Sequence, residues 1–206
     1  MIRISVPALL CGLSLCVAVA APADEADEPS QIIQNAANEM LKDLDAHRAE
    51  YRKDPSKVYA LVDRVLLPHF DTQYAAQQVL AKHWRTATPA QRERFINSFY
   101  HSLLKNYGTA LLDFTADRLI ILPFKGDIST GRAVVRTQVR RDNGTQVPVN
   151  YSLRKNDQGW MAYDVSIEGI SYIKSYRTDF DAEIAQKGLD AVIERIEQQG
   201  VKVSDK

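Results

Sequence analysis

Cysteine is almost missing from this chain of 206 residues. Its two cysteines, Cys11 and Cys16, both fall within the first 23 residues. Without that segment the chain has no thiol, which excludes disulfides, thiolate metal sites and cysteine nucleophiles. A domain of about 180 residues can bury enough apolar surface to fold without such covalent bonds. Its stability must therefore come from an apolar core.

The chain also lacks an excess of either charge. It carries 26 Lys and Arg against 26 Asp and Glu. Nucleic-acid-binding proteins normally show a clear basic excess, so nucleic acid is not an expected partner. The histidines His47, His69, His83 and His101 never lie three or four residues apart, so no helical metal pair is predicted. The sequence contains neither a Gly-rich phosphate loop nor a serine nucleophile elbow.

The one long apolar run lies at the N-terminus, from Val6 to Val19. Arg3 precedes this run, and two small-residue patterns suited to cleavage end at Ala20 and Ala23. Such a segment is typical of a secretory signal peptide and is too short to span a membrane. We therefore expect residues 1–23 to be a signal peptide, cleaved near Ala20 or Ala23, and residues 24–206 to form a single exported domain.

The first half of the remaining chain predicts helices. Apolar residues recur at helical spacing from about residue 30 to 53, and Asp54-Pro55 predicts the start of a second helix. Thr88, Pro89 and Gln91 together form a capping box for a long helix over residues 89–107. We expect Gly108 to end that helix in the left-handed conformation.

The second half alternates with the period of β-strands. Residues 118–124, 132–141, 146–155 and 160–168 predict four strands, and Asn143-Gly144 predicts a hairpin between the second and third. Helices are predicted again from Ile170 onward. This order predicts an α+β fold with N-terminal helices, an antiparallel sheet of about four strands and C-terminal helices. Tyrosines concentrate in these elements, and their hydroxyl groups favour a pocket whose opening is hydrated.

Four segments of the chain resemble the MlaC family of phospholipid-binding proteins. They are LPHFD at 67–71, WRTATPAQRERF at 84–95, the Y-x-L-R-K and G-W pattern at 151–160, and YDVSIEGIS at 163–171. The resemblance extends from about Ala36 to Gln198. Ala81 departs from it, because family members often carry glycine there.

The resemblance implies a soluble periplasmic carrier rather than an enzyme, with no cofactor other than its phospholipid ligand. Such a carrier shuttles glycerophospholipid between an outer-membrane lipoprotein–porin complex and the inner-membrane Mla ABC transporter complex, and so maintains outer-membrane lipid asymmetry and toluene tolerance.

A lipid carrier needs a dry interior. Each exposed CH₂ costs about 0.8 kcal/mol, so a diacyl lipid with on the order of 30 such groups faces roughly 20 kcal/mol or more on leaving a bilayer. Face alternation assigns one wall of the cavity to the sheet and the other to the long helix. The expected lining residues are Leu80, Trp84, Phe95, Phe99, Leu103, Tyr107, Val147, Val149, Tyr151, Tyr163, Val165, Ile167, Ile170, Tyr172 and Ile173. Arg177 is the expected contact for a headgroup or a partner, because a guanidinium matches phosphate in a fork geometry.

Two other functions remain open from the residues themselves. A small α+β enzyme could use His69 with Asp71, which lie two residues apart, or Asp164 with Glu168 at the end of a strand. A periplasmic adaptor without any ligand is the other alternative.

The signal-peptide assignment makes a direct prediction. N-terminal sequencing of the exported protein should find a new terminus after Ala20 or Ala23. An exported protein that still begins at Met1 would instead indicate an uncleaved N-terminal anchor.

Overall fold

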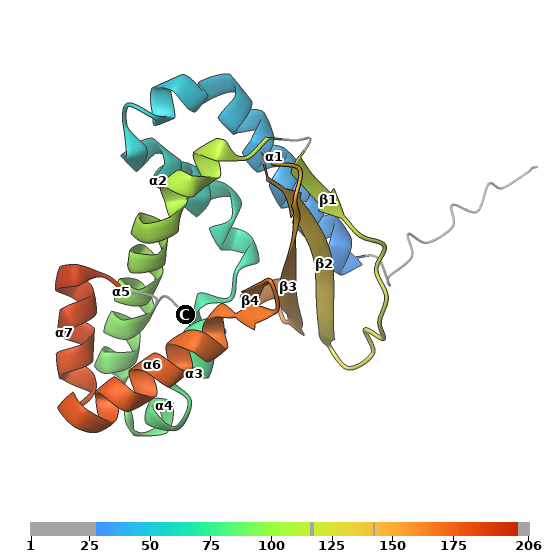
Figure 1. The fold of residues 1–206 in the computed structure, drawn as a ribbon. Coiled ribbons are helices and arrows are strands. Elements are labelled where there is room, and N and C mark those ends of the chain that lie inside the picture. The colour runs from blue at the N-terminus through green and yellow to red at the C-terminus, as the bar shows by residue number, and fades with distance from the viewer. Residues whose placement is uncertain (1–27, 116–117, 142, 202–206) are drawn as a thin grey trace, which may run out of the picture.

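The computed structural model describes residues 28–115, 118–141 and 143–201. The predicted signal peptide and cleavage site lie outside these ranges. The described chain is α+β as predicted, with helices before and after an antiparallel sheet (Figure 1). In chain order, the first helices are α1 (Glu28–Tyr51), α2 (Pro55–Val65), η2 (Leu67–His69), α3 (Thr72–Leu80), α4 (Lys82–Thr86), α5 (Pro89–Tyr107) and η3 (Gly108–Asp113). The strands β1 (Leu119–Ile121), β2 (Arg132–Arg140), β3 (Gln146–Asn156), β4 (Gly159–Ile167) and β5 (Ile170–Ser171) follow, and then α6 (Tyr172–Lys187) and α7 (Leu189–Gln199).

The start of α5 is confirmed and its end is different from the prediction. The Thr88 side chain accepts from the Gln91 backbone, and the Gln91 side chain accepts in return from the Thr88 backbone. Gly108, however, has φ −58° and continues into η3. A Cβ at this position would lie 2.9 Å from Cε1 of Tyr59. Gly108 is thus required for the close approach of α2, not for a left-handed backbone.

The sheet has five strands rather than about four, in the order β1-β2-β3-β4-β5 with every neighbour antiparallel. The additional strand, β5, is joined to β4 by Glu168-Gly169, which have φ values of 53° and 84°. Two central residues with positive φ make the tight hairpin turn that Asn-Gly usually signals. Glutamate rarely adopts this backbone, so no residue pattern predicted the turn.

Register divides the sheet into two faces, because residues directly opposite each other share a face. The inner face carries apolar pairs such as Val135–Tyr151 and Tyr151–Val165. The outer face carries polar pairs such as Arg132–Arg154 and Arg136–Asn150. A β-bulge between Ser152 and Leu153 interrupts the β3–β4 register.

The bulge changes which side chains of β4 lie together. Simple alternation places Tyr163 with Val165 and Ile167, and Ala162 with Asp164. The structure contradicts this grouping: Ala162 joins the buried cluster of the inner face, whereas Tyr163 contacts Tyr74 and Arg132 on the outer side. An extra residue in one strand re-aims every side chain beyond it.

Three apolar clusters hold the described chain together. The helical cluster joins α3, α5, α6 and α7, and the second joins α1, α2 and η3. The third joins the inner face of the sheet to the start of α1 through Ile33. Phe70, after η2, packs against both the first and the third, and it forms a bridge to Ala162 of β4. In Figure 1 the helices α5, α6 and α7 stand together beside the sheet.

Asp164 links the sheet directly to α6. Its side chain is 8% exposed, and it accepts hydrogen bonds from Ser171 Oγ at 2.6 Å and from the backbone N–H of Ile173 at 3.1 Å. Ser171 in turn caps α6 by accepting from the Lys174 N–H. The Asp164 carboxylate of β4 therefore accepts hydrogen bonds from donors at the start of α6, which belongs to the helical cluster.

Replacing Asp164 with alanine should lower the free energy of unfolding by about 1–3 kcal/mol, because one buried and one partly buried donor lose their acceptor. Urea denaturation measures this change. Glu93→Ala, which removes an exposed carboxylate from α5, should stay within about 0.5 kcal/mol of the wild type. Equal effects of the two substitutions would contradict the capping role.

Candidate functional site

Partly exposed apolar side chains connect the inner face of the sheet to the helices. Ile167 lies opposite both Val149 and Ile170, and Val165 lies opposite Tyr151. Two residues after Ile170, at the start of α6, the ring of Tyr172 meets Tyr107 of α5 at 5.7 Å. We call the set Tyr107, Tyr151, Val165, Ile167, Ile170 and Tyr172 the apolar strip. Ile170 is 59% exposed and Tyr107 is 37% exposed, so this strip has apolar area that a ligand can cover.

Aromatic rings continue from the strip into the helical cluster. Tyr172 contacts Tyr176, which stacks on Phe180 and meets Phe99 edge-on at 5.1 Å. The hydroxyls of Tyr107 and Tyr176 are 3.3 Å apart. Burial raises the pKa of the Tyr176 phenol well above its ordinary value, and the hydrogen bond to Tyr107 adds to the effect. The Tyr176 phenol is therefore neutral at physiological pH.

The structure separates the predicted lining residues into two groups. The first group is buried: Leu80, Phe95, Phe99, Val147, Val149 and Ile173. The second is partly or largely exposed: Trp84, Leu103, Tyr107, Tyr151, Tyr163, Val165, Ile167, Ile170 and Tyr172. In the described conformation, only the side chains of this second group keep substantial accessible surface that a ligand could cover.

The predicted opposing walls are not brought together in this conformation. Phe95 and Phe99 were expected to face the sheet, but they stack on each other and meet Phe180 of α6 in the helical cluster. Tyr163 points to the outer side of the sheet because of the bulge. Trp84 lies 5.0 Å beneath the guanidinium of Arg92. The apolar strip is the part of the expected lining that strand register and the Tyr107–Tyr172 ring contact bring together.

Arg177 joins two helices. Its Nε donates to the backbone carbonyl of Gln78 at 2.6 Å, and Nη2 donates to Oε1 of the same residue at 3.3 Å. These bonds hold α6 against α3. A contact with a headgroup or partner would have to use the remaining donors of this side chain.

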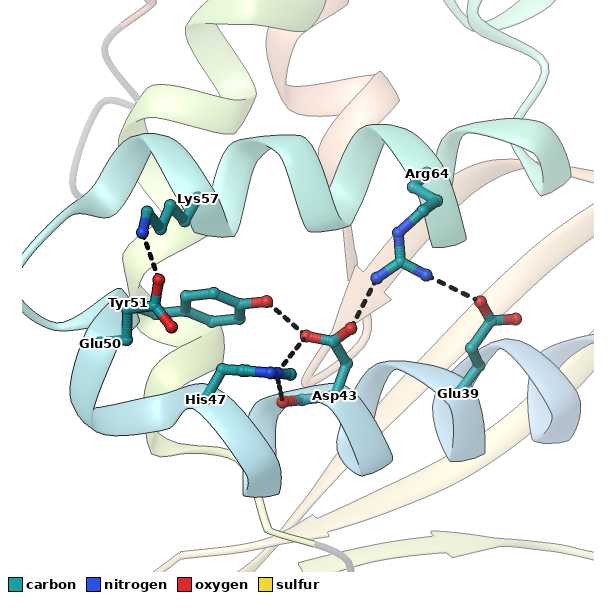
Figure 2. Close-up of polar contacts among 7 residues, drawn as sticks. All are labelled: Glu39, Asp43, His47, Glu50, Tyr51, Lys57 and Arg64. Carbon is teal, nitrogen blue, oxygen red and sulfur yellow. Dashed lines mark hydrogen bonds and ion pairs between the residues drawn. The ribbon is translucent and has the colours of Figure 1, made fainter.

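Two open hollows stand out on the described surface, and neither is bordered by a predicted lining residue. One, of about 370 Å³, lies between α5 and the end of α7. The other, of about 440 Å³, lies between α1 and α2 and is lined by His47, Glu50, Tyr51, Lys57, Ala60, Leu61 and Arg64. Figure 2 shows that its polar side chains have partners: Lys57 pairs with Glu50, whereas His47, Tyr51 and Arg64 pair with Asp43.

Asp43 is at the centre of this polar network. It accepts from the Tyr51 hydroxyl and from Arg64 at 2.6 Å, and Arg64 also reaches Glu39 (Figure 2). Burial raises the pKa of Asp43, but the hydrogen bonds from Tyr51 and Arg64 outweigh burial and hold it below its ordinary value. The bond to Asp43 raises the pKa of Tyr51 to about 12. The cations here already have carboxylate partners, so this network fastens α1 to α2.

The residues considered for catalysis have structural partners. Asp71 caps α3 through the Tyr74 N–H and pairs with Arg154 at 2.8 Å. His69 and Asp71 share no hydrogen bond within the described chain. Two histidine–carboxylate pairs do form in the described chain, His47 with Asp43 at 3.3 Å within α1 and His83 with Asp181 at 2.7 Å between α4 and α6. Sequence spacing did not indicate the second pair.

The described residues contain no group of three or more histidine and acidic side chains placed to hold a metal ion. Among the helices within residues 28–201 that the structure covers, none combines the length and hydrophobicity of a membrane span.

Comparison with known proteins identifies relatives for most of this chain. The family model for the MlaC protein matches residues 34–198. The toluene tolerance protein ttg2D of Pseudomonas putida is 32% identical over 166 residues, which cover 80% of this chain and 77% of the relative. The intermembrane phospholipid transport system binding protein MlaC of Haemophilus influenzae is 23% identical over 173 residues, covering 82% of this chain and 81% of that protein.

A solved structure has the same fold. It is the phospholipid-binding protein from Ralstonia solanacearum in complex with a phospholipid, with a TM-score of 0.77 and 24% sequence identity. The match covers 82% of this chain and 95% of that one.

The Tyr51–Asp43 bond predicts a pH dependence of stability. Because the folded-state pKa of about 12 exceeds the ordinary value of 10.0, the stabilisation is complete below pH 10 and is lost as pH rises through 12. Tyr51→Phe should lower the free energy of unfolding by roughly 1 kcal/mol at neutral pH. The gap between variant and wild type should close across that window in urea denaturation. Tyr59→Phe on α2 is the control, and a pH-independent gap for Tyr51→Phe would contradict the assignment.

Proposed function

Because this chain belongs to the MlaC family, we propose that it is a periplasmic carrier of glycerophospholipid and not an enzyme. In this proposal it shuttles lipid between an outer-membrane lipoprotein–porin complex and the inner-membrane Mla ABC transporter complex. The names of its relatives, which include a phospholipid transport binding protein, support the proposal. The structural observation that carries it is the apolar strip between the sheet and α6.

The strip has the chemistry that acyl chains require. Its six side chains are aliphatic or phenolic, and none of them is charged. They connect one face of the sheet to α5 and α6. Each CH₂ removed from water gains about 0.8 kcal/mol, so covering the strip with a chain favours binding. The hydroxyls of Tyr107 and Tyr172 supply the polar rim near which a headgroup can remain in water.

Lipid entry requires the layers to move. The helical cluster packs against itself through α3, α5, α6 and α7, and Asp164 ties it to the sheet. Separation of α6 from the sheet would enlarge the strip into a cavity, and it would break the Asp164 hydrogen bonds and one set of the Phe70 contacts. A ligand that binds the open form better than the closed one shifts the population toward it, and docking of a partner can reverse the shift.

Mass spectrometry of lipids extracted from protein purified without detergent tests the proposal. Stoichiometric glycerophospholipid supports the carrier. An empty protein whose hydrolytic activity is lost on His69→Ala would support the enzyme alternative. An empty protein that still binds the transporter complex would support the adaptor alternative.

Filling the strip should expel the ligand. Val165→Trp places a large ring on the inner face, and we expect it to reduce copurifying phospholipid at least about fivefold, because the ring occupies the volume of the acyl chain. Circular dichroism and thermal unfolding verify that the variants fold. Val134→Trp is the matched control, since Val134 lies on the outer face of the same sheet and is 48% exposed. Unchanged lipid in a folded Val165→Trp variant would remove this residue from the binding surface.

A further inference from the structure

The outer face of β1, β2 and β3 is partly to largely exposed, and its own side chains carry charge of one sign. By register it consists of Ile120, Arg132, Val134, Arg136, Gln138, Arg140, Gln146, Pro148, Asn150, Ser152 and Arg154. Four of these are arginines, and the described residues of this face include no aspartate or glutamate. The whole chain is neutral, with 26 bases and 26 acids. The basic surface is therefore a local arrangement and not a consequence of composition.

Arg132 is held in place without a carboxylate among the described residues. Its Nη2 donates to the Tyr74 hydroxyl at 2.8 Å and its Nη1 donates to the Tyr163 hydroxyl at 3.3 Å. Its guanidinium also lies 5.4 Å and 5.6 Å from the centres of these two rings. This arrangement depends on the β-bulge, because the bulge turns Tyr163 outward toward Arg132. An arginine fixed by two phenols loses little conformational entropy when it binds an anion.

Its neighbours extend the site along the sheet. Arg154 lies opposite Arg132, stacks 4.3 Å from the Tyr74 ring and pairs with Asp71. Arg136 follows two positions after Val134, and alternate residues of a strand are about 6.6 Å apart. The aliphatic side chains of Val134 and Ile120 are 48% and 40% exposed. Fixed guanidinium groups surrounding exposed aliphatic groups have the composition of a protein interface.

We infer that this outer face docks a protein partner that presents a cluster of carboxylates, with Arg132 as the anchor. The inference deepens the proposed function, on which it rests, by naming the surface through which the carrier meets a membrane complex. Arginine pairs with carboxylates in a fixed two-bond geometry, whereas a diffuse anionic membrane surface attracts lysine equally well and needs no oriented side chain. All four bases of the face are arginines, which favours the protein partner over a bilayer.

Binding of the purified exported protein to the purified periplasmic parts of the two complexes tests the inference. We expect wild-type binding to weaken from low to high salt (about 50 to 300 mM), because exposed charges are screened. The double variant Arg132→Glu/Arg136→Glu should bind at least about tenfold more weakly at low salt. Lys42→Glu/Lys53→Glu, the same total charge change at two exposed positions in and just after α1, should bind as the wild type does.

Two conservative variants test the anchor geometry. Tyr74→Phe keeps every charge but removes one of the hydroxyls that hold Arg132, and Arg132→Lys keeps the charge but removes the fork. Each should weaken binding severalfold if the fixed guanidinium contacts a carboxylate. Wild-type affinity in both variants would overturn the role of Arg132 as anchor.

The remaining outcomes separate this inference from the carrier proposal. Lipid content is measured on every variant and should be unchanged, since the outer face lies away from the apolar strip. Full affinity of the double variant for the complexes overturns the docking surface and leaves the carrier proposal standing. If the double variant no longer binds phosphatidylglycerol vesicles but still binds the complexes, the face contacts a membrane. That result also overturns the inference. A wild type that binds neither complex overturns it too, whereas absence of lipid overturns the carrier proposal.

Discussion

The buried carboxylate of Asp164 is the constraint on which the arrangement of this molecule depends. It belongs to a strand, yet it accepts from Ser171 and from the first turn of α6. The sheet and the helical cluster have separate apolar interiors, so apolar contacts by themselves leave their relative orientation loosely defined. A directional hydrogen bond to a helix N-terminus fixes both the position and the direction of α6. The apolar strip forms because Ile167, Ile170 and Tyr172 lie close to these hydrogen bonds between β4 and α6.

The β-bulge in β4 has a second organising effect. It places Val165 and Ile167 on the inner face while it turns Tyr163 outward to Arg132. One irregularity thus contributes to two surfaces, an apolar one suited to acyl chains and a basic one suited to carboxylates. In the proposed carrier, their separation on opposite faces would let a ligand and a partner bind at the same time, so that the two events could be coupled through the sheet.

Parts of the fold were predictable because they rest on local chemistry. The capping box of Thr88 and Gln91, the Asp54 cap of α2 and the strand alternation of β2 and β3 each involve neighbours in sequence. Gly108 was predicted wrongly because its reason is a contact with Tyr59, which is distant in sequence. The fifth strand was not predicted because a Glu-Gly hairpin turn is unusual. In the candidate site, the apolar residue types were identified, but the separation of buried from exposed members required the packing.

The sequence alone determined the α+β order of elements, the absence of thiols after residue 23, and the membership in a family whose motifs run along most of the chain. These properties depend on residue identity and short-range spacing. Tertiary structure decided which apolar residues remain partly exposed, and that Arg177 braces α3. It also decided that Arg132 has two tyrosines as its partners. Such contacts join residues up to about a hundred positions apart, as in the bond from Arg177 to Gln78, and they depend on a register that one bulge shifts.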